Sequence, residues 1–201
     1  MVFIKDLVEV SEKVSATSRK KEKISLLAHF FQQAKGREIA LAASYLSGQL
    51  PQDRLGIGWA TLQEALKDLI EKLQPLNLIE LDRLFEDISR EKGAGSLEKK
   101  VKILRDIFSS IQKNERDFLT RLIMGEIRQG ALEGLVLEAL AQASSLYIDN
   151  LRQSLMFSGD IGEVAKVTLE EGITGLSRFQ PKLFHPISPM LASPVEGEDE
   201  A

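Results

Sequence analysis

The residues best suited to chemistry in this chain lie between residues 121 and 143, where two helical patterns meet at a hinge. Arg128 and Gly130 come just before an amphipathic run from Leu132 to Ala143. The first N–H groups of a helix lack partners within the helix, and the helix dipole adds partial positive charge there. Because glycine also allows close approach of a ligand, such a helix start is suited to binding a phosphate. The alternative is an ordinary helical hairpin with a capping glycine.

Three further segments combine small residues with bases near a predicted helix start. With the hinge, the candidate binding residues are Ser18, Arg19, Lys20, Lys21, Arg54, Gly56, Gly58, Gly95, Ser96, Lys99, Lys100, Arg128 and Gly130. Their N–H, hydroxyl and cationic groups suit phosphate and sugar oxygens, and no exposed helix carries the polar array that reads base edges. We therefore expect sequence-independent nucleic-acid binding through a shallow or minor-groove approach. Lysine clusters that are only solvated helix faces are the alternative.

Catalytic patterns are scarce. Two histidines and no cysteine make a transition-metal site improbable. The segments Gly56-Ile-Gly58 and Gly93-Ala-Gly95 do not follow a predicted strand and have no Lys-Ser pair, which disfavours nucleotide binding. Trp59 is interpreted as a packing anchor whose indole N–H is satisfied nearby, with stacking on a base as the alternative. The chain offers no nucleophile and base pair for a self-sufficient enzyme.

The composition is that of an ordinary globular protein, with 43% hydrophobic and 28% charged residues among 201. No apolar run is long enough to span a bilayer, and the first residues do not form a signal-peptide pattern. The net charge of −4 argues against a nucleic-acid partner, but residues 193–201 contain four acids and no base. Residues 1–192 therefore carry 26 bases and 26 acids. A neutral folded part leaves room for local basic surfaces.

Helical periodicity predicts an all-α fold, as a single compact multi-helix domain over residues 1–174. Asn77 with Glu80, and Asp160 with Glu163, have capping-box spacing, and Ser18, Ser96 and Asn114 are predicted N-caps. Four of the six prolines follow residue 175, where an extended strap is expected over 175–201. Helices are predicted near residues 2–14, 19–34, 37–47, 60–73, 78–91, 97–112, 115–127, 131–143, 146–157 and 161–171.

The sequence also contains a weak internal repeat, called the echo below. Arg54-Leu-Gly56 followed by Glu64-Ala-Leu66 matches Arg128-Gln-Gly130 followed by Glu138-Ala-Leu140, 74 residues later. Residues 15–21 likewise match residues 93–99 at an offset of 78. The echo predicts a duplicated unit with a pseudo-two-fold axis, whose turns converge on one basic face. Chance similarity between two helical hairpins is the alternative.

Five segments together resemble the N-terminal DNA-binding domain of ATP-dependent DNA ligases, particularly the larger bacterial type. The segments are Ser44-Tyr-Leu-Ser-Gly48, Arg54-Leu-Gly-Ile-Gly58-Trp59, Gly93-Ala-Gly-Ser96, Arg121-Leu-Ile-Met-Gly125-Glu-Ile-Arg128-Gln-Gly130 and Pro186-Ile-Ser-Pro-Met-Leu-Ala192. The segments occur in the family's order, and the resemblance covers about residues 3–192. Gln129 departs from the pattern, because the family usually has an apolar residue there.

This resemblance implies a helical, pseudo-symmetric domain that contacts the minor groove of duplex or nicked DNA on both sides of the nick. The parent protein would be an ATP-dependent ligase of DNA repair, replication or recombination, with ATP and Mg²⁺ as cofactors and adenylation and OB-fold domains as neighbours. The family's Lys-x-Asp-Gly nucleophile motif is missing, since the chain contains no Asp-Gly pair. We therefore expect an inactive domain fragment without its own cofactor, monomeric, cytoplasmic and nucleoid-associated. The alternative is a helical protein-interaction scaffold.

Overall fold

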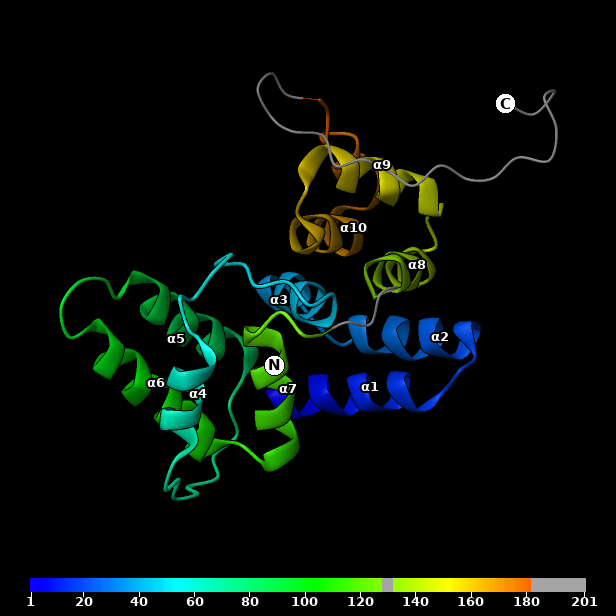
Figure 1. Cartoon of the computed structure of the whole chain (residues 1–201). Coiled ribbons are helices and arrows are strands. Elements are labelled where there is room, and N and C mark those ends of the chain that lie inside the picture. Colours follow the sequence, from blue (N-terminus) through cyan, green and yellow to red (C-terminus); the bar gives the residue numbers. More distant parts are fainter. Residues whose placement is uncertain (128–131, 182–201) are drawn as a thin grey trace, which may run out of the picture.

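Ten helices make up the part of the chain that the computed structural model describes, residues 1–127 and 132–181 (Figure 1). This arrangement confirms the all-α prediction. The helices are α1 Ile4–Ala16, α2 Lys20–Phe31, α3 Arg37–Leu46, α4 Trp59–Leu66, α5 Leu78–Arg90, α6 Ser96–Ser110, α7 Lys113–Ile123, α8 Leu132–Ser144, α9 Ile148–Ser158 and α10 Ile161–Leu176. Most of the predicted strap, residues 182–201, lies outside the described residues, as do residues 128–131.

The largest error in the predicted boundaries concerns α4, which ends at Leu66 although a helix was predicted to residue 73. Lys67 is extended, and Asp68 has a φ of +51°, in the left-handed region. The following segment lies along the end of α6, where Lys72 N donates to Ser109 O over 2.7 Å and Gln74 N donates to Ser110 O over 2.8 Å. These bonds satisfy carbonyls that the last turn of α6 leaves without a helical partner. Tertiary pairing therefore overrides the local helical pattern.

Two of the predicted caps are confirmed. Asn77 Oδ1 accepts from Glu80 N over 2.9 Å, and Asp160 Oδ1 accepts from Glu163 N over 3.0 Å. The predictions for Ser18, Ser96 and Asn114 are wrong by one or two residues, since the N-cap positions hold Arg19, Gly95 and Gln112. Gln112 rather than Asn114 is the N-cap of α7, because the Gln112 N–H donates to the Glu115 carboxylate and closes a capping box.

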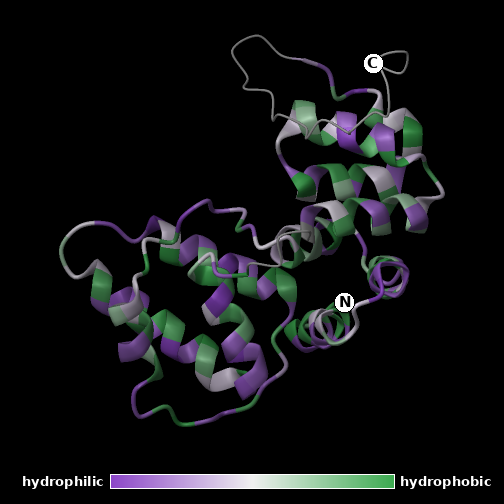
Figure 2. Cartoon of the chain, turned by 45° about the vertical axis from the view of Figure 1, so that its right-hand side comes forward, coloured by the Kyte–Doolittle hydropathy of each residue, from purple (hydrophilic) through white to green (hydrophobic). Residues whose placement is uncertain are grey.

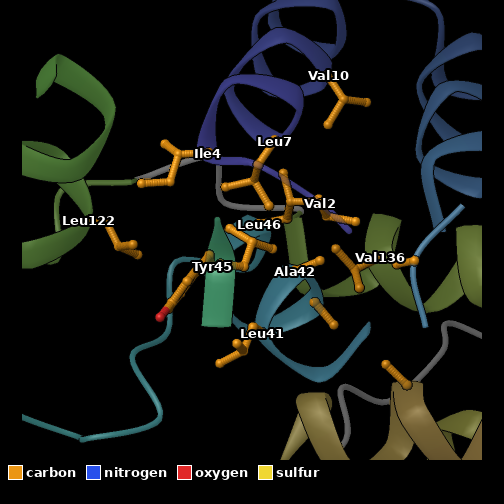
Figure 3. Packing of buried hydrophobic residues seen from close by; sticks show 14 of the residues in the cluster. Val2, Ile4, Leu7, Val10, Leu41, Ala42, Tyr45, Leu46, Leu122 and Val136 are labelled. Atoms are coloured by element: carbon orange, nitrogen blue, oxygen red, sulfur yellow. The ribbon is translucent and has the colours of Figure 1, made fainter. Parts of the chain in front are cut away.

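Burial of one apolar face on each helix holds the fold together. Figure 2 shows that most helices carry both hydrophobic and hydrophilic residues, the pattern of helices with one buried face. Val2 and Leu7 lie close to Ala42 and Leu46 in the core (Figure 3), and all four side chains are at most 4% exposed. Each large side chain buried there contributes about 1.5–3 kcal/mol through removal of apolar surface from water. The core thus connects the amino terminus and α1 with α3.

The packing of α1 to α8 repeats in two groups. Helices α1 and α2 pack together with α8, while α5 and α6 pack together with α4. Helix α7 packs on α1, and α3 packs in the corresponding way on α5. Helices α9 and α10 pack against each other and cover α3 and α8. Each group therefore contains two helices from one half of the chain and a third helix from the other half.

The two groups meet where the segments before α1 and α5 run side by side. Ile4 N donates to Leu76 O over 2.9 Å, and Leu78 N donates to Val2 O over 3.0 Å, around an antiparallel bridge between Phe3 and Asn77. The two bonds correspond to each other at an offset of 74, because Ile4 corresponds to Leu78 and Val2 corresponds to Leu76. This reciprocity is what a pseudo-two-fold axis at this point produces, and it supports the predicted duplication, which stays a prediction.

Among the helices of residues 1–127 and 132–181, none combines the length and the apolar character that crossing a membrane requires.

Candidate functional site

A hydrogen bond between two distant segments organises one part of the candidate surface. The Lys100 ammonium donates to the Leu55 carbonyl oxygen over 2.7 Å, and the lysine is 9% exposed. Lys100 lies in the second turn of α6, and Leu55 lies in the loop before α4. Two of the predicted segments, residues 54–58 and 95–100, are therefore adjacent, and we call them together the α4/α6 site.

Helices α4 and α6 run parallel from this site. Their starts are linked by the Lys100–Leu55 bond, and further along Arg105 Nη2 donates to Glu64 O over 2.8 Å. Gly58 and Gly95 occupy the N-cap positions of the two helices. Because parallel helices present their free N–H groups at the same end, both helix starts contribute partial positive charge to the α4/α6 site.

Two features favour glycine at Gly56. Its φ of +63° lies in the left-handed region, and a Cβ placed there would lie 3.0 Å from Lys100 Nζ. Gly58, by contrast, has an extended backbone, and a Cβ placed on it would meet no atom of the described residues within 4 Å. The turn at Gly56 therefore brings the backbone close to the lysine, whereas Gly58 leaves open space at the start of α4.

Two bases of the α4/α6 site are exposed. Arg54 lies in solvent next to the buried Leu55. The Lys99 side chain is 65% exposed and pairs with Glu91 over 3.0 Å. A surface ion pair of this kind contributes about 0–1 kcal/mol, so Lys99 can exchange its partner at low cost. Both side chains are accessible to an anion.

A buried polar cluster anchors the loop between α3 and α4. Asp82, 2% exposed, accepts a hydrogen bond from Gln52 Nε2 over 2.7 Å and pairs with Arg37. Tyr45 lies nearby, and burial raises the pKa of its phenol, an effect that the Asp82 charge increases and the Arg37 charge opposes. The Tyr45 hydroxyl has no hydrogen-bond partner within the described residues. Through Gln52, the cluster ties the loop before Arg54 to α5.

The predicted residues Ser18, Arg19, Lys20 and Lys21 lie exposed at the turn between α1 and α2 and at the start of α2. Lys20 pairs with Glu138 of α8 over 2.8 Å. Glu138 corresponds to Glu64 at the offset of 74, and the Glu64 carboxylate lies 3.9 Å from Arg105 of α6. The packing of α2 with α8 corresponds to the packing of α6 with α4. We call residues 18–21, together with Glu138 of α8, the α2/α8 site.

Arg128 and Gly130 lie outside the described residues. The segments on either side of them contact the loop that follows α3. A Cβ at Gly48 would lie 3.2 Å from the Ile127 carbonyl oxygen, and Gln49 Nε2 donates to the Glu133 carboxylate over 3.0 Å. Residues 48–58 therefore extend from the neighbourhood of α8 to α6.

The predicted turns lie apart within the described residues, and their convergence on one basic face stays a prediction. Figure 1 shows the turn between α1 and α2 at one side of the molecule and the loop between α5 and α6 at the opposite side. The reason is that each group of helices takes one helix from the other half of the chain, since α8 packs on α2 and α4 packs on α6. Two separate sites result in place of one.

Sequence reasoning missed two properties of the α4/α6 site. Lys100 was grouped with the exposed bases, but its ammonium is bound inside the protein; its position beside Val101 and Leu104 on an amphipathic helix was the available signal. Trp59 was interpreted as a packing anchor, but it is 55% exposed. Its position as the first residue of α4, directly after the turn that contains Gly56 and Gly58, leaves it at the edge of the core.

Neither site contains, among its described residues, a group of three histidine, aspartate or glutamate side chains able to hold a metal ion, and the same holds throughout the described ranges. An open hollow of about 390 Å³ lies elsewhere, between α1 and α7, and is lined by polar and apolar residues alike, among them Ser11, Glu12, Phe118 and Arg121.

The described part of the chain is thus an all-α domain with glycine-containing turns and bases at its helix starts. Residues 67–141 match the family model described as DNA ligase N terminus. This match covers the segment from the end of α4 into α8, including the start of α6.

Curated relatives extend the similarity to the whole chain. A probable DNA ligase of Anaeromyxobacter sp. (strain Fw109-5) is 39% identical over 197 residues, which are 98% of this chain and 38% of the relative. A probable DNA ligase of Saccharopolyspora erythraea is 37% identical over 201 residues, 100% of this chain and 39% of the relative. A probable DNA ligase of Sorangium cellulosum is 37% identical over 97% of this chain and 37% of the relative. The chain therefore spans about two fifths of these proteins, and its resemblance to DNA ligases, with their N terminus over residues 67–141, is confirmed.

Proposed function

We propose that this chain is the DNA-binding domain of an ATP-dependent DNA ligase and binds duplex or nicked DNA without sequence specificity, through phosphate and minor-groove contacts. The observation that carries the proposal is the α4/α6 site, where the Lys100–Leu55 bond joins two predicted turns and leaves Arg54 and Lys99 exposed beside two helix starts. Similarity to probable DNA ligases along the whole chain supports it.

The two sites give the proposed interaction its geometry. Because the α2/α8 and α4/α6 sites lie apart, each contacts its own stretch of sugar-phosphate backbone. Phosphate contacts position a protein on DNA without reading sequence, which suits an enzyme that must act at any break. Arg19 and Lys21 serve one site, Arg54 and Lys99 serve the other, and Lys100 supports the turn from inside. Arg128 and Gly130 complete the α2/α8 site in this proposal.

Catalysis belongs to other parts of the parent protein. ATP and Mg²⁺ are the proposed cofactors of those parts, and adenylation and OB-fold domains are the proposed neighbours of this one. The proposed partner is DNA, so a cytoplasmic, nucleoid-associated location follows for the chain, with roles in repair, replication or recombination.

The test is binding of the 201-residue chain to nicked duplex as a function of salt. Each phosphate contact contributes about 0.9 to the slope of log affinity against log salt concentration. We expect a steep salt slope and equal affinity for unrelated sequences. The substitutions Arg54→Ala, Lys99→Ala and Arg128→Ala, singly and combined in a triple variant, should weaken binding. Unchanged affinity of the triple variant at low salt would refute the assigned surface.

A further inference from the structure

Two large apolar side chains are exposed at the α4/α6 site. Trp59, the first residue of α4, is 55% exposed, and Leu97, the second residue of α6, is 58% exposed. The corresponding first residues of α1 and α5, Ile4 and Leu78, are fully buried. Since α4 and α6 run parallel with their starts joined by the Lys100–Leu55 bond, Trp59 and Leu97 lie at the same end of the helix pair.

The surroundings of this apolar pair are basic. Residues 53–59 and 91–102, which form the site and its flanks, contain five bases and three acids. Four of the bases are exposed, namely Arg54, Lys92, Lys99 and Lys102. One of the acids, Glu91, is paired with Lys99. An apolar surface surrounded by exposed cations suits a partner that has an apolar surface between two rows of negative charge. Duplex DNA has this character in its minor groove, where deoxyribose and base edges lie between two phosphate backbones.

We propose that Trp59, supported by Leu97, packs against deoxyribose and base edges of the bound duplex. This inference rests on the proposed function and adds an apolar contact to the phosphate contacts. Proteins that bind the minor groove commonly place apolar side chains against base steps. Gly56 and Gly58, the second of which has open space around it, allow the DNA backbone to approach the indole closely.

The contact is made by one half of the domain. At the offset of 74, the residue that corresponds to Trp59 is Glu133, whose carboxylate accepts a hydrogen bond from Gln49. A carboxylate at that position repels the sugar-phosphate backbone rather than packing on it. The two sites therefore contact DNA differently, the α4/α6 site by charge and apolar packing, the α2/α8 site by charge.

Trp59 is the only tryptophan of the chain, so its fluorescence reports on the contact directly. The experiment titrates the 201-residue chain with a dye-labelled nicked duplex and records dye anisotropy and tryptophan emission. We expect quenched and shifted emission at saturation. Trp59→Ala should weaken binding roughly fivefold or more, as loss of an aromatic–base contact does. The salt slope should stay unchanged because no phosphate contact is lost, and Trp59→Phe should retain most of the affinity.

Tyr147→Ala is the matched control, since Tyr147 is an 85% exposed aromatic residue before α9 in another part of the molecule (Figure 1). Its affinity should equal that of the unaltered chain. Thermal unfolding of Trp59→Ala should also match the unaltered chain. If the duplex binds while emission stays constant and Trp59→Ala binds normally, this inference is refuted and the proposed function stands. If the unaltered chain does not change the dye anisotropy at low salt, the proposed function itself is refuted.

Discussion

The Lys100 ammonium lies 2.7 Å from the carbonyl oxygen of Leu55, and both residues are buried. In the predicted duplication, Lys100 belongs to the second unit and Leu55 to the first. The bond therefore fixes the loop before α4 on the start of α6 and holds the backbone of the neighbouring Arg54 in place. A basic residue that looks like a phosphate ligand in the sequence is a structural support in the fold.

Replacing Lys100 with methionine should distinguish a structural support from a phosphate ligand. The Leu55 carbonyl would lose its partner in a buried position, so we expect the free energy of unfolding to fall by about 1–3 kcal/mol. DNA affinity should fall because the turn moves, while the salt slope stays the same. Urea denaturation and salt-dependent binding measure the two effects. Lys99→Met is the control, with a stability change under about 1 kcal/mol. A salt slope reduced by about 0.9 for Lys100→Met would show that Lys100 contacts phosphate.

The two glycines before α4 should respond differently to serine. Gly56→Ser places a side chain at a φ of +63° and against Lys100 Nζ, so we expect destabilisation of about 1–2 kcal/mol. Gly58→Ser keeps an extended backbone and adds a preferred N-cap side chain, so its stability should be equal or slightly higher. Thermal unfolding of both variants measures the difference. Equal stability of the two variants would contradict the close approach at Gly56.

Charge substitutions should show whether the two sites are independent. Lys21→Ala and Lys99→Ala alter different sites, so their effects on DNA affinity should add to within about 0.5 kcal/mol. Arg54→Ala and Lys99→Ala alter the same site, and their effects should deviate from additivity. Lys166→Ala, on the exposed side of α10, is the control and should leave affinity unchanged. Strong coupling between Lys21 and Lys99 would show that the two sites act as one.

Tyr45→Phe removes a buried hydroxyl without a partner among the described residues. We expect the free energy of unfolding at neutral pH to stay the same or rise by up to about 1 kcal/mol. Burial raises the pKa of Tyr45 in the folded protein above its ordinary value of 10.0. The unfolded phenol therefore ionises first, so this group lowers stability as the pH rises above about 10.

Tyr45→Phe should lose less stability than the unaltered chain over that alkaline range. Denaturation curves measured at neutral pH and above about pH 10 give the comparison. Tyr147→Phe, at an 85% exposed position, serves as the control and should follow the unaltered chain. A loss of more than about 1 kcal/mol for Tyr45→Phe at neutral pH would show that the hydroxyl is hydrogen-bonded.

Local sequence patterns determined most of the secondary structure of this protein, whereas the end of α4 at Leu66 depends on tertiary pairing with α6. Helical periodicity predicted each described helix, because burial of one apolar stripe needs only residues three and four apart. Asn77 and Asp160 were found for the same reason, since a cap and its N–H partner are three residues apart. The resemblance to DNA ligases also rested on short segments that can be read directly from the chain.

Only the tertiary structure decided which segments meet. The starts of α2 and α6 lie at opposite sides because each packs with a helix from the other half of the chain, an exchange that no local pattern encodes. Burial of Lys100 and exposure of Trp59 follow from that packing, since the partner of Lys100 is a backbone carbonyl 45 residues away. A backbone carbonyl is present at every residue, so the sequence carries no mark that singles out Leu55.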